Sequence, residues 1–290
     1  MNIFLENDYI KIGIKSAGAE LFTVVHKRNK LEYMWRGDPA FWGKTSPVLF
    51  PIVGTLKDNT FRFRGNAYAL PRHGFARDQD FEVVSTSGNS ALFAIHDTAE
   101  SLLKYPFPFQ LLIEYTIHDD TLEVGYRVEN RGGDEMYFSL GAHPAFAVPL
   151  IAGTTYEDYY LEFSETENAP RWPINAAGLI EGIATPLLSG TNRLPLTRAL
   201  FLQDAVVLKN LRSKRVSLKH ASVQHGLDFH FDGFPFLGIW AAKNADFLCI
   251  EPWCGIADAA THDQELTRKE GIEKLAAGAQ WNRTWKVHFY

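Results

Sequence analysis

Three short segments of the sequence combine residue types that can transfer protons. The first, "PRHGFAR", holds Arg72, His73 and Arg77; the second, "GAHP", holds His143; the third, "IEPW", holds Glu251. Each segment sets an ionisable side chain in an apolar run, next to glycine or proline. Two imidazoles and one carboxylate form a general acid/base set, because one group can take a proton while another delivers one.

Each of these residues also has a purely structural interpretation. His73 could bond to the backbone of its own turn, although Gly74 beside it would let a ligand approach closely. His143 could be a hydrogen-bonded core histidine; Pro144 keeps it extended, so its ring should project from a strand end. Glu251 follows the apolar run "FLCI", and a glutamate is almost never fully buried unless it is paired. Glu251 is therefore either salt-bridged or functional.

Other kinds of chemistry find little support. No serine or cysteine has an obvious activating base, and Ser139 in "FSLGAH" does not lie in a nucleophile elbow. Sequences of the GxGxxG or Walker type are absent, so no nucleotide is expected. His73, His143 and Glu251 could form a two-histidine, one-carboxylate metal set. They lack the usual close-spaced pair of ligands, and we expect no bound metal.

The elements that must position these residues are strands. Apolar residues alternate on both sides of Asp119-Asp120 in "LLIEYTIHDDTLEVGYRVEN", which predicts a β-hairpin with one buried face. "TFRFRGNAYAL" predicts a second hairpin that turns at Gly65-Asn66. "AVVLKNLRSKRVSLKH" predicts a third that turns at 212–214. Further strands are expected in "SGNSALFAIHD", "FLCIEPW" and "RTWKVHFY".

Helical signals are few. "TAESLLKY" predicts two helical turns that end before Pro106, whereas Gly271 interrupts "LTRKEGIEKLAAG" and leaves that segment undecided. Many short strands, punctuated by glycine and proline and without alternating helices, predict an all-β sandwich or barrel. Residues 167–196 have little pattern and are interpreted as an excursion within one domain, with a domain boundary as the alternative. We expect a single domain over residues 1–290.

Composition narrows the partners and the compartment. The chain has 290 residues and a net charge of −5, with no basic stripe, so nucleic acid is not expected to bind. Cys249 and Cys254 are too far apart for a CxxC pair and predict two buried thiols rather than a disulfide. The N-terminus lacks a signal peptide, and no apolar run is long enough to span a membrane. We therefore expect a cytoplasmic protein.

Three stretches together resemble the aldose 1-epimerase (galactose mutarotase-like) superfamily, and most of all its branch of LacX-type proteins. They are "FPIVGTLKDNTFRFRGNAYALPRHGFARDQDFEVV", "GAHPAFAVPL" and "IEPWCGIAD", which occur in the family's order over most of the chain. The resemblance implies a large antiparallel β-supersandwich with few helices and an open cleft for a sugar ring.

The resemblance also implies roles for the acid/base residues. Glu251 matches the general base that acts on the anomeric hydroxyl, and His143 matches the general acid that acts on the ring oxygen. His73 matches a second histidine of the site. Arg77 and Arg72 are then substrate-binding cations. Anomer exchange needs no redox change and no covalent enzyme bond, so no cofactor is expected.

Two further residues enter the predicted sugar site. Asp228 in "GLDFH" resembles an acceptor of sugar hydroxyls in the mutarotases. Trp253 beside Glu251 could offer its flat indole to the apolar face of a sugar, or belong to the core. The segment "HGFAR" departs from galactose mutarotases, in which two glycines follow the first histidine, so the preferred substrate is left open.

The function expected from these observations is a mutarotase that interconverts the α and β anomers of a hexose or related aldose. One alternative is a hexose-6-phosphate mutarotase, with an anion site drawn from Arg62, Arg64, Arg72 and Arg77. Another is a carbohydrate-binding protein without catalysis. The expected partner is a small sugar or sugar phosphate, and the expected oligomeric state is a monomer or homodimer.

Overall fold

The chain folds almost entirely into antiparallel strands, as the sequence predicts. A computed structural model describes all residues, 1–290. It contains strands β1 to β23, one short α-helix and five 3-10 helices. The helices are α1 (Ala99–Lys104), η1 (Lys57–Asn59), η2 (Ala76–Asp78), η3 (Tyr156–Asp158), η4 (Arg198–Phe201) and η5 (Leu266–Arg268). None of them has the length and apolar character needed to cross a bilayer.

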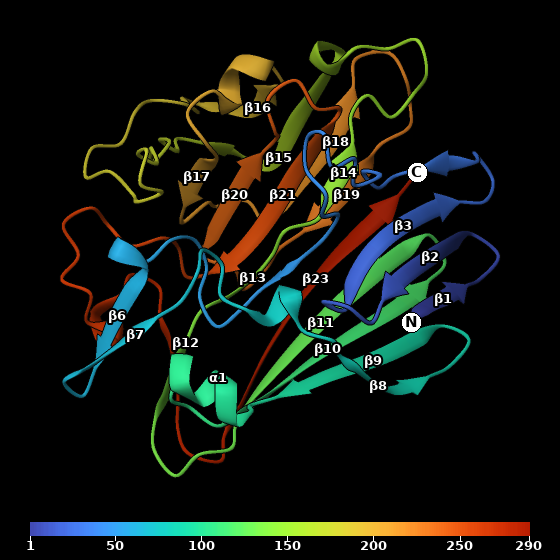
Figure 1. Cartoon of the computed structure of the whole chain (residues 1–290). Coiled ribbons are helices and arrows are strands. Elements are labelled where there is room, and N and C mark those ends of the chain that lie inside the picture. Colours follow the sequence, from blue (N-terminus) through green and yellow to red (C-terminus); the bar gives the residue numbers. More distant parts are fainter.

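The largest sheet has nine strands and runs diagonally through the molecule, from β15 near the top of Figure 1 to β8 near the bottom. Its strands, in spatial order, are β16 (Thr191–Pro195), β15 (Tyr159–Glu167), β18 (Arg215–His220), β19 (Leu227–His230), β23 (Gln280–Phe289), β11 (Thr121–Asn130), β10 (Phe109–His118), β9 (Ser90–His96) and β8 (Glu82–Thr86).

A six-stranded sheet packs against this one and has the buried strand β21 near its centre. Its strands, in spatial order, are β17 (Val206–Lys209), β20 (Phe236–Trp240), β21 (Phe247–Cys254), β13 (Leu140–Ala142) and β5 (Val48–Leu49), with β14 (Ala145–Ala147) also paired to β21. Phe146 of β14 meets Phe229 of β19 with ring centroids 6.1 Å apart, so the two sheets share one core.

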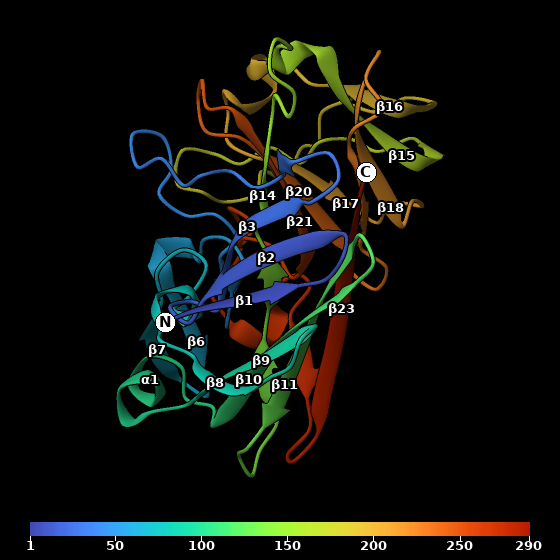
Figure 2. The ribbon, with the colours of Figure 1, turned by 90° about the vertical axis from the view of Figure 1, so that its right-hand side faces the viewer.

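Smaller sheets complete the molecule. Figure 2 shows the N-terminal strands β1 to β3 in front of the long strands of the nine-stranded sheet, and the Tyr115 hydroxyl of β10 donates to the Ala19 carbonyl at that contact. The four-stranded sheet comprises β1 (Asn2–Glu6), β2 (Ile10–Lys15), β3 (Glu20–His26) and β4 (Leu31–Glu32). Two pairs remain, β6 (Thr60–Phe63) with β7 (Asn66–Ala69), and β12 (Met136–Phe138) with β22 (Glu273–Leu275).

The hairpin that turns at Asp119-Asp120 is confirmed as β10 and β11. Its alternating apolar side chains are buried, while the residues between them are more exposed. This alternation fixes the register, because a slip by one residue would turn the apolar face to water. The predicted helix is also confirmed: α1 begins after Thr98, whose side chain accepts from the Ser101 amide.

Two other sequence predictions need correction. The hairpin of β6 and β7 turns at Arg64-Gly65, one residue earlier than predicted, because both residues take the left-handed conformation that a tight turn requires. The third hairpin was wrong: β17 pairs with β20 in the six-stranded sheet, whereas β18 pairs with β15 and β19 in the nine-stranded sheet. Periodicity identifies strands but not their partners. The undecided segment after Gln264 forms η5 and β22.

Candidate active site

Strand β21 places Glu251 in the interior. Every residue of β21 is buried, which accounts for its nearly continuous apolar sequence. Side chains alternate along a strand, so Glu251 and Trp253 project from the same face. That face meets a cavity, which both side chains line. Ile250 faces the other way and belongs to the main apolar core.

The strand next to β21 is broken at His143. Strand β13 pairs with β21 at Gly141, and β14 pairs with it again from Ala145, so 142–144 cross the gap without a regular ladder. Pro252 lies opposite this gap. Because proline has no backbone N–H, it needs no hydrogen-bond acceptor on the neighbouring strand. The break therefore leaves few backbone groups unpaired, and it turns the His143 side chain to the cavity next to Glu251.

His143 and Glu251 form a buried contact. The Nε2 atom of His143 lies 3.2 Å from Oε2 of Glu251, and the two side chains are only 10% and 1% exposed. Burial raises the pKa of Glu251 well above its usual value, an effect that Arg72 opposes in part. Burial likewise lowers the pKa of His143. Both shifts favour the neutral forms of the two side chains, so the pair carries no net charge at neutral pH.

Aromatic rings fix the orientation of His143. Its imidazole stacks on Trp42 at 4.9 Å between centroids and meets the Trp240 ring edge-on at 5.6 Å. The His73 ring approaches from a further side, with its centroid 5.9 Å from that of His143. Because these rings surround it, the His143 side chain is restricted to a rotamer that directs Nε2 at Glu251.

His73 is held by the backbone of Gly54. The His73 amide donates to the Gly54 carbonyl at 2.9 Å, and the Gly54 amide donates back to Nδ1 of His73 at 3.1 Å. A neutral imidazole accepts at only one nitrogen, and burial lowers the pKa of His73 well below its usual value. The Arg72 Nε–H also points at Nε2, at 3.3 Å, so each ring nitrogen faces an N–H donor. We assign the acceptor role to Nδ1 and the proton to Nε2, because the contact of Nδ1 with Gly54 is shorter and is reinforced by the His73 amide, which donates back to the Gly54 carbonyl.

Gly74 has a different role from the one predicted. A side chain at Gly74 would come within 2.3 Å of the Phe50 carbonyl oxygen, and Gly74 does not line the cavity. The missing side chain therefore admits the backbone at Phe50, not a ligand. This close approach, together with a positive φ of 70°, explains why glycine follows His73.

Arg72 is oriented by Asp204, a residue that the sequence reasoning missed. Two guanidinium nitrogens of Arg72 lie 3.1 Å from the two carboxylate oxygens of Asp204, and both residues line the cavity. Burial works to raise the pKa of Asp204, but the hydrogen bonds from Arg72 outweigh it and leave that pKa lowered. Asp204 directly precedes the apolar run "AVVL", whereas Glu251 directly follows one.

Two further cations, Arg77 and Lys243, line the cavity. Arg77 donates to the Arg72 carbonyl at 2.9 Å, and its buried Nε atom has no hydrogen-bond partner but lies 3.7 Å from a carboxylate oxygen of Asp78. Lys243 is exposed and makes no ion pair. Arg62 and Arg64, considered above for an anion site, do not line this cavity, and Arg64 pairs instead with Asp134 at 2.8 Å.

These side chains surround one central cavity of about 460 Å³. Its volume is in the range of small-ligand sites. Residues 174–180, from the weakly patterned segment, form part of its wall. The lining residues are Trp42, Gly54, Arg72, His73, Arg77, His143, Ile174, Gly178, Ile180, Phe201, Asp204, Ala205, Val207, Trp240, Ala241, Ala242, Lys243, Glu251, Trp253 and Ala257.

Comparison with known proteins identifies the family. A family model described as aldose 1-epimerase matches residues 1–271. The chain belongs to the aldose 1-epimerase family. This membership puts it among isomerases.

Individual relatives agree with this assignment. The chromosomal LacX protein of Lactococcus lactis subsp. lactis is 34% identical over 285 residues, 95% of each chain. A galactose mutarotase related enzyme from Lactobacillus acidophilus superposes with a TM-score of 0.96 at 32% identity, covering 100% of this chain and 97% of that one. A galactose mutarotase-like protein from Lactobacillus casei ATCC 334 gives 0.94 at 34% identity, with both chains fully covered. The predicted resemblance to LacX-type proteins and the all-β fold are thus confirmed.

In this aldose 1-epimerase family member, most of the predicted site residues meet in the central cavity. Glu251, His143, His73, Arg72, Arg77 and Trp253 all line it. Asp228 does not. It lies on β19, where its carboxylate pairs with Arg215 at 3.2 Å and accepts from Ser217. Asp228 therefore lies outside the central cavity, and Asp204 is the aspartate that lines it.

Trp253 lines the cavity as predicted but is only 5% exposed. Its indole lies over two glycines on the neighbouring strands: a side chain would come within 2.5 Å of the ring at Gly141 and within 2.3 Å at Gly238. These glycines make room for the ring to lie flat against the sheet. Trp42 and Trp240 are less buried, so they offer more indole surface to a ligand.

One group of residues in the site has the chemistry of a metal-binding set. Ligand atoms of His143, Cys249 and Glu251 lie within 4.8 Å of one another, a set different from the predicted one because Cys249 replaces His73. Burial raises the pKa of the Cys249 thiol well above its usual value, which opposes formation of the thiolate ligand. A cation here would also use the Nε2 atom of His143 and the Oε2 atom of Glu251, which now lie in contact with each other. Both cysteines are free and buried, as predicted.

The glycine under Trp253 gives a first prediction. Gly238→Ala should lower the free energy of unfolding by about 1–3 kcal/mol, since the added methyl overlaps the indole. In a Trp253→Leu background this penalty should largely disappear, because the overlapping ring is gone. Chemical denaturation of the four proteins measures it. Gly88→Ala is the control, since nothing lies within 4 Å of that position. An equal penalty in both backgrounds would contradict the contact.

The buried carboxylate gives a second prediction. Glu251→Gln should raise the free energy of unfolding at pH 8 by about 1–2 kcal/mol, because the amide has no charge to bury. Burial holds the pKa of Glu251 in the folded protein above its ordinary value of 4.5, so unfolding releases a proton and stability falls as pH rises. The advantage of the variant should thus grow from pH 4.5 upward. Denaturation from pH 5 to 8 measures this; a constant difference would contradict it.

At lower pH, His143 makes the free energy of unfolding change with pH in the opposite direction. Its pKa in the folded protein lies below the ordinary histidine value of 6.5, so unfolding takes up a proton below that pH and stability rises with pH there. The two slopes oppose each other between pH 4.5 and 6.5. The comparison with Glu251→Gln is clearest above pH 6.5, where the Glu251 contribution remains alone.

Proposed function

We propose that this protein is an aldose 1-epimerase (mutarotase) that interconverts the α and β anomers of a hexose or related aldose by general acid/base ring opening. The observation that carries the proposal is the 3.2 Å contact between His143 Nε2 and Glu251 Oε2 in the wall of the central cavity. Proton removal and proton delivery can occur there within one short distance.

A proton that can move between His143 Nε2 and Glu251 Oε2 suits the reaction. When it sits on His143, the ionised Glu251 takes the proton of the C1 hydroxyl while His143 gives one to the ring oxygen, and the C1–O5 bond breaks. The open-chain aldehyde then turns about its C1–C2 bond. Closure on the other face returns both protons in reverse, so no proton is gained or lost overall. Each positioned group typically contributes about a hundredfold to ten-thousandfold.

The remaining cavity residues have binding roles in this proposal. His73 offers its Nε2 proton to oxygen atoms of the sugar or to charge that develops on them. The bidentate pair of Arg72 and Asp204 presents a rigid donor and acceptor for hydroxyl groups. Trp42 and Trp240 supply most of the apolar surface for a ring face, and Trp253 adds a smaller part. None of these steps needs a cofactor.

A carbohydrate-binding protein without catalysis is the competing proposal. A binding site has no use for a carboxyl group that burial forces toward its neutral form, since a hydroxyl or amide would bind sugar without that penalty. Glu251 is fully buried beside a histidine whose pKa is shifted the opposite way. Titratable pairs shifted apart in one cavity are typical of acid/base sites. We therefore favour catalysis.

A second candidate substrate is an anionic sugar such as a hexose 6-phosphate. Three cations line the cavity, and Asp204 offsets the charge of Arg72, while the pair of His143 and Glu251 is neutral. Asp78 partly offsets the charge of Arg77, and Lys243, which makes no ion pair, leaves the cavity positive in a protein whose net charge is −5. Such a field favours an anionic ligand.

The catalytic assignment predicts large losses of rate. Glu251→Gln and His143→Asn should each slow anomer exchange by about 10²- to 10⁴-fold while the fold is retained. Polarimetry or NMR of freshly dissolved α-D-glucose or α-D-galactose measures the exchange. Asp228→Asn is the matched control, because it makes the same carboxyl-to-amide change outside the cavity. If wild-type protein accelerates no common aldose or aldose 6-phosphate, the mutarotase proposal fails; an unchanged rate in Glu251→Gln removes Glu251 from the base role.

The charge of the cavity predicts how substrates differ. If the substrate carries a phosphate, Lys243→Met should lower kcat/KM for the hexose 6-phosphate by about fivefold, the effect of one exposed charge pair, and leave the neutral hexose unaffected. Added salt should weaken the phosphate reaction more than the neutral one. Steady-state kinetics with both sugars measure this. Lys104→Met on α1 removes a cation elsewhere and serves as the control. Equal effects on both sugars would argue against an anionic substrate.

A further inference from the structure

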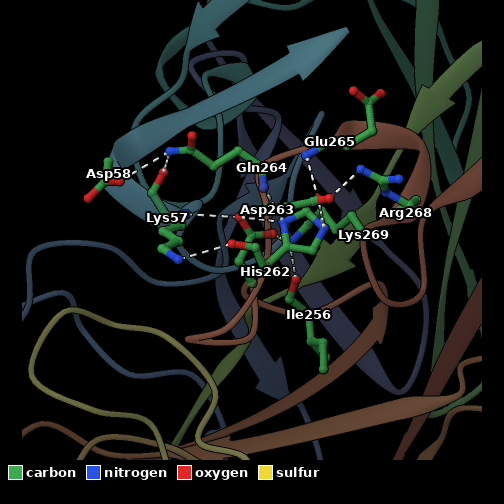
Figure 3. A network of polar contacts seen from close by, with 10 residues as sticks. Lys57, Asp58, Ile256, His262, Asp263, Gln264, Glu265, Arg268 and Lys269 are labelled. Atoms are coloured by element: carbon green, nitrogen blue, oxygen red, sulfur yellow. Dashed lines mark hydrogen bonds and ion pairs between the residues drawn. The ribbon is translucent and has the colours of Figure 1, made fainter.

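A buried ion pair that takes no part in the proposed chemistry lies behind the wall of the central cavity. Nζ of Lys269 lies 2.8 Å from Oδ1 of Asp258, and both side chains are 1% exposed. Nζ also donates to the Ile256 carbonyl at 2.6 Å, a contact that Figure 3 includes. A buried ion pair is weak evidence for stability, since removing two charges from water offsets most of their attraction. Its partners indicate what else it does.

Asp258 joins three segments of the chain. Its amide donates to the Thr55 carbonyl at 2.9 Å, and its Oδ2 accepts from the Lys57 amide, also at 2.9 Å. Its own carbonyl accepts from the Ile180 amide at 2.9 Å. The three segments each contribute to the cavity wall, through Gly54, Ile180 and Ala257. A change at Asp258 would therefore reach three parts of the wall together.

The segments touch too closely to move independently. A side chain at Gly54 would lie 2.6 Å from the Cα and Cβ atoms of Ala257. A side chain at Gly178 would lie 2.5 Å from the Thr55 hydroxyl. Backbones packed at this distance transmit displacement, because no gap exists to absorb it.

At one end of these packed segments, the Gly54 amide contacts the ring of His73. Gly54 donates to Nδ1 of His73, and the His73 amide donates back to Gly54. The direction of that Gly54 N–H depends on the course of 54–57, which Asp258 holds at Thr55 and Lys57. Polar contacts continue outward from Lys57. The Lys57 ammonium donates to the His262 carbonyl at 3.1 Å, and the Gln264 side-chain amide donates to the Lys57 carbonyl at 2.9 Å (Figure 3).

We propose that the buried pair of Asp258 and Lys269 is a positioning device for the site: it holds 54–57 so that the Gly54 amide keeps the His73 proton on Nε2, facing the cavity. Lys269 anchors Asp258 from behind, and its bond to the Ile256 carbonyl fixes the turn that follows β21. Neither residue lines the cavity. The consequence for sugar turnover rests on the proposed function, whereas the effect on the tautomer does not.

The test measures the tautomer and the kinetics separately. Lys269→Met removes the ammonium, and the double variant Asp258→Asn/Lys269→Met leaves no unpaired charge, so it folds even where the single variant does not. Proteins labelled with ¹⁵N at histidine report the tautomer of His73 by NMR. We expect one tautomer, protonated at Nε2, in wild type, and a mixture in both variants. For the sugar that wild type turns over, we expect kcat/KM to fall at least tenfold, mainly in kcat, because His73 then loses its donor to developing charge.

A destabilised control separates positioning from general loss of stability. Glu167→Ala removes a buried carboxylate that accepts from the amide and hydroxyl of Ser213, away from the cavity wall. It should lower the unfolding temperature while leaving the His73 tautomer and kcat unchanged. A single His73 tautomer in both Lys269 variants, or the same tautomer change in Glu167→Ala, would overturn the proposal. If wild type turns over no sugar, the NMR arm still decides the positioning role, while that absence counts against the proposed function alone.

Discussion

The site depends on one constraint, a carboxyl group held in a strand that is buried on every side. An isolated ionised carboxylate would be very costly at this depth, so Glu251 needs either a proton or a cationic partner. His143 Nε2 lies 3.2 Å from Glu251 Oε2, close enough to accept that proton or, when protonated, to be that cation. In the proposed function, proton transfer between these two atoms would produce the ionised base and the protonated acid without exchange with water. Burial, which destabilises the ionised form, would then also favour this transfer within the pair.

The sheet is irregular where this pair requires it. An unbroken partner strand beside β21 would point successive side chains alternately to the two faces and would offer no bend for His143. The interruption between β13 and β14 supplies that bend, opposite Pro252, which has no amide to leave unpaired. Gly141 and Gly238 make room for the indole of Trp253 beside it. The β-sandwich therefore carries the site at a local irregularity, where His143 Nδ1, Glu251 Oε2 and Trp253 Nε1 are buried without a hydrogen-bond partner.

The sequence predicts those residues of the site whose type is unusual for their immediate neighbours. Glu251 stands out because a carboxylate at the end of an apolar run is rare, and the alternation in 109–130 fixes a hairpin without help from the rest of the fold. Pairings between distant segments were beyond it. Asp204 also adjoins an apolar run, yet only the folded chain brings it to Arg72 and places Asp228 on β19, outside the cavity. The sequence prediction wrongly paired β17 with β18 for the same reason, because periodicity does not indicate which strands pair.

The neutral and the charged side chains of this cavity lie at different depths, for a physical reason. The pair of His143 and Glu251 lies in the buried wall, where low polarity shifts both pKa values in the direction that favours the neutral forms. Fixed charges stay nearer to water: Arg72 is offset by Asp204, and Lys243 is exposed. A fixed cation in contact with the pair would hold Glu251 ionised and weaken it as a base. At a distance, the same cations can orient a polar or anionic sugar and leave the proton free to move between His143 and Glu251.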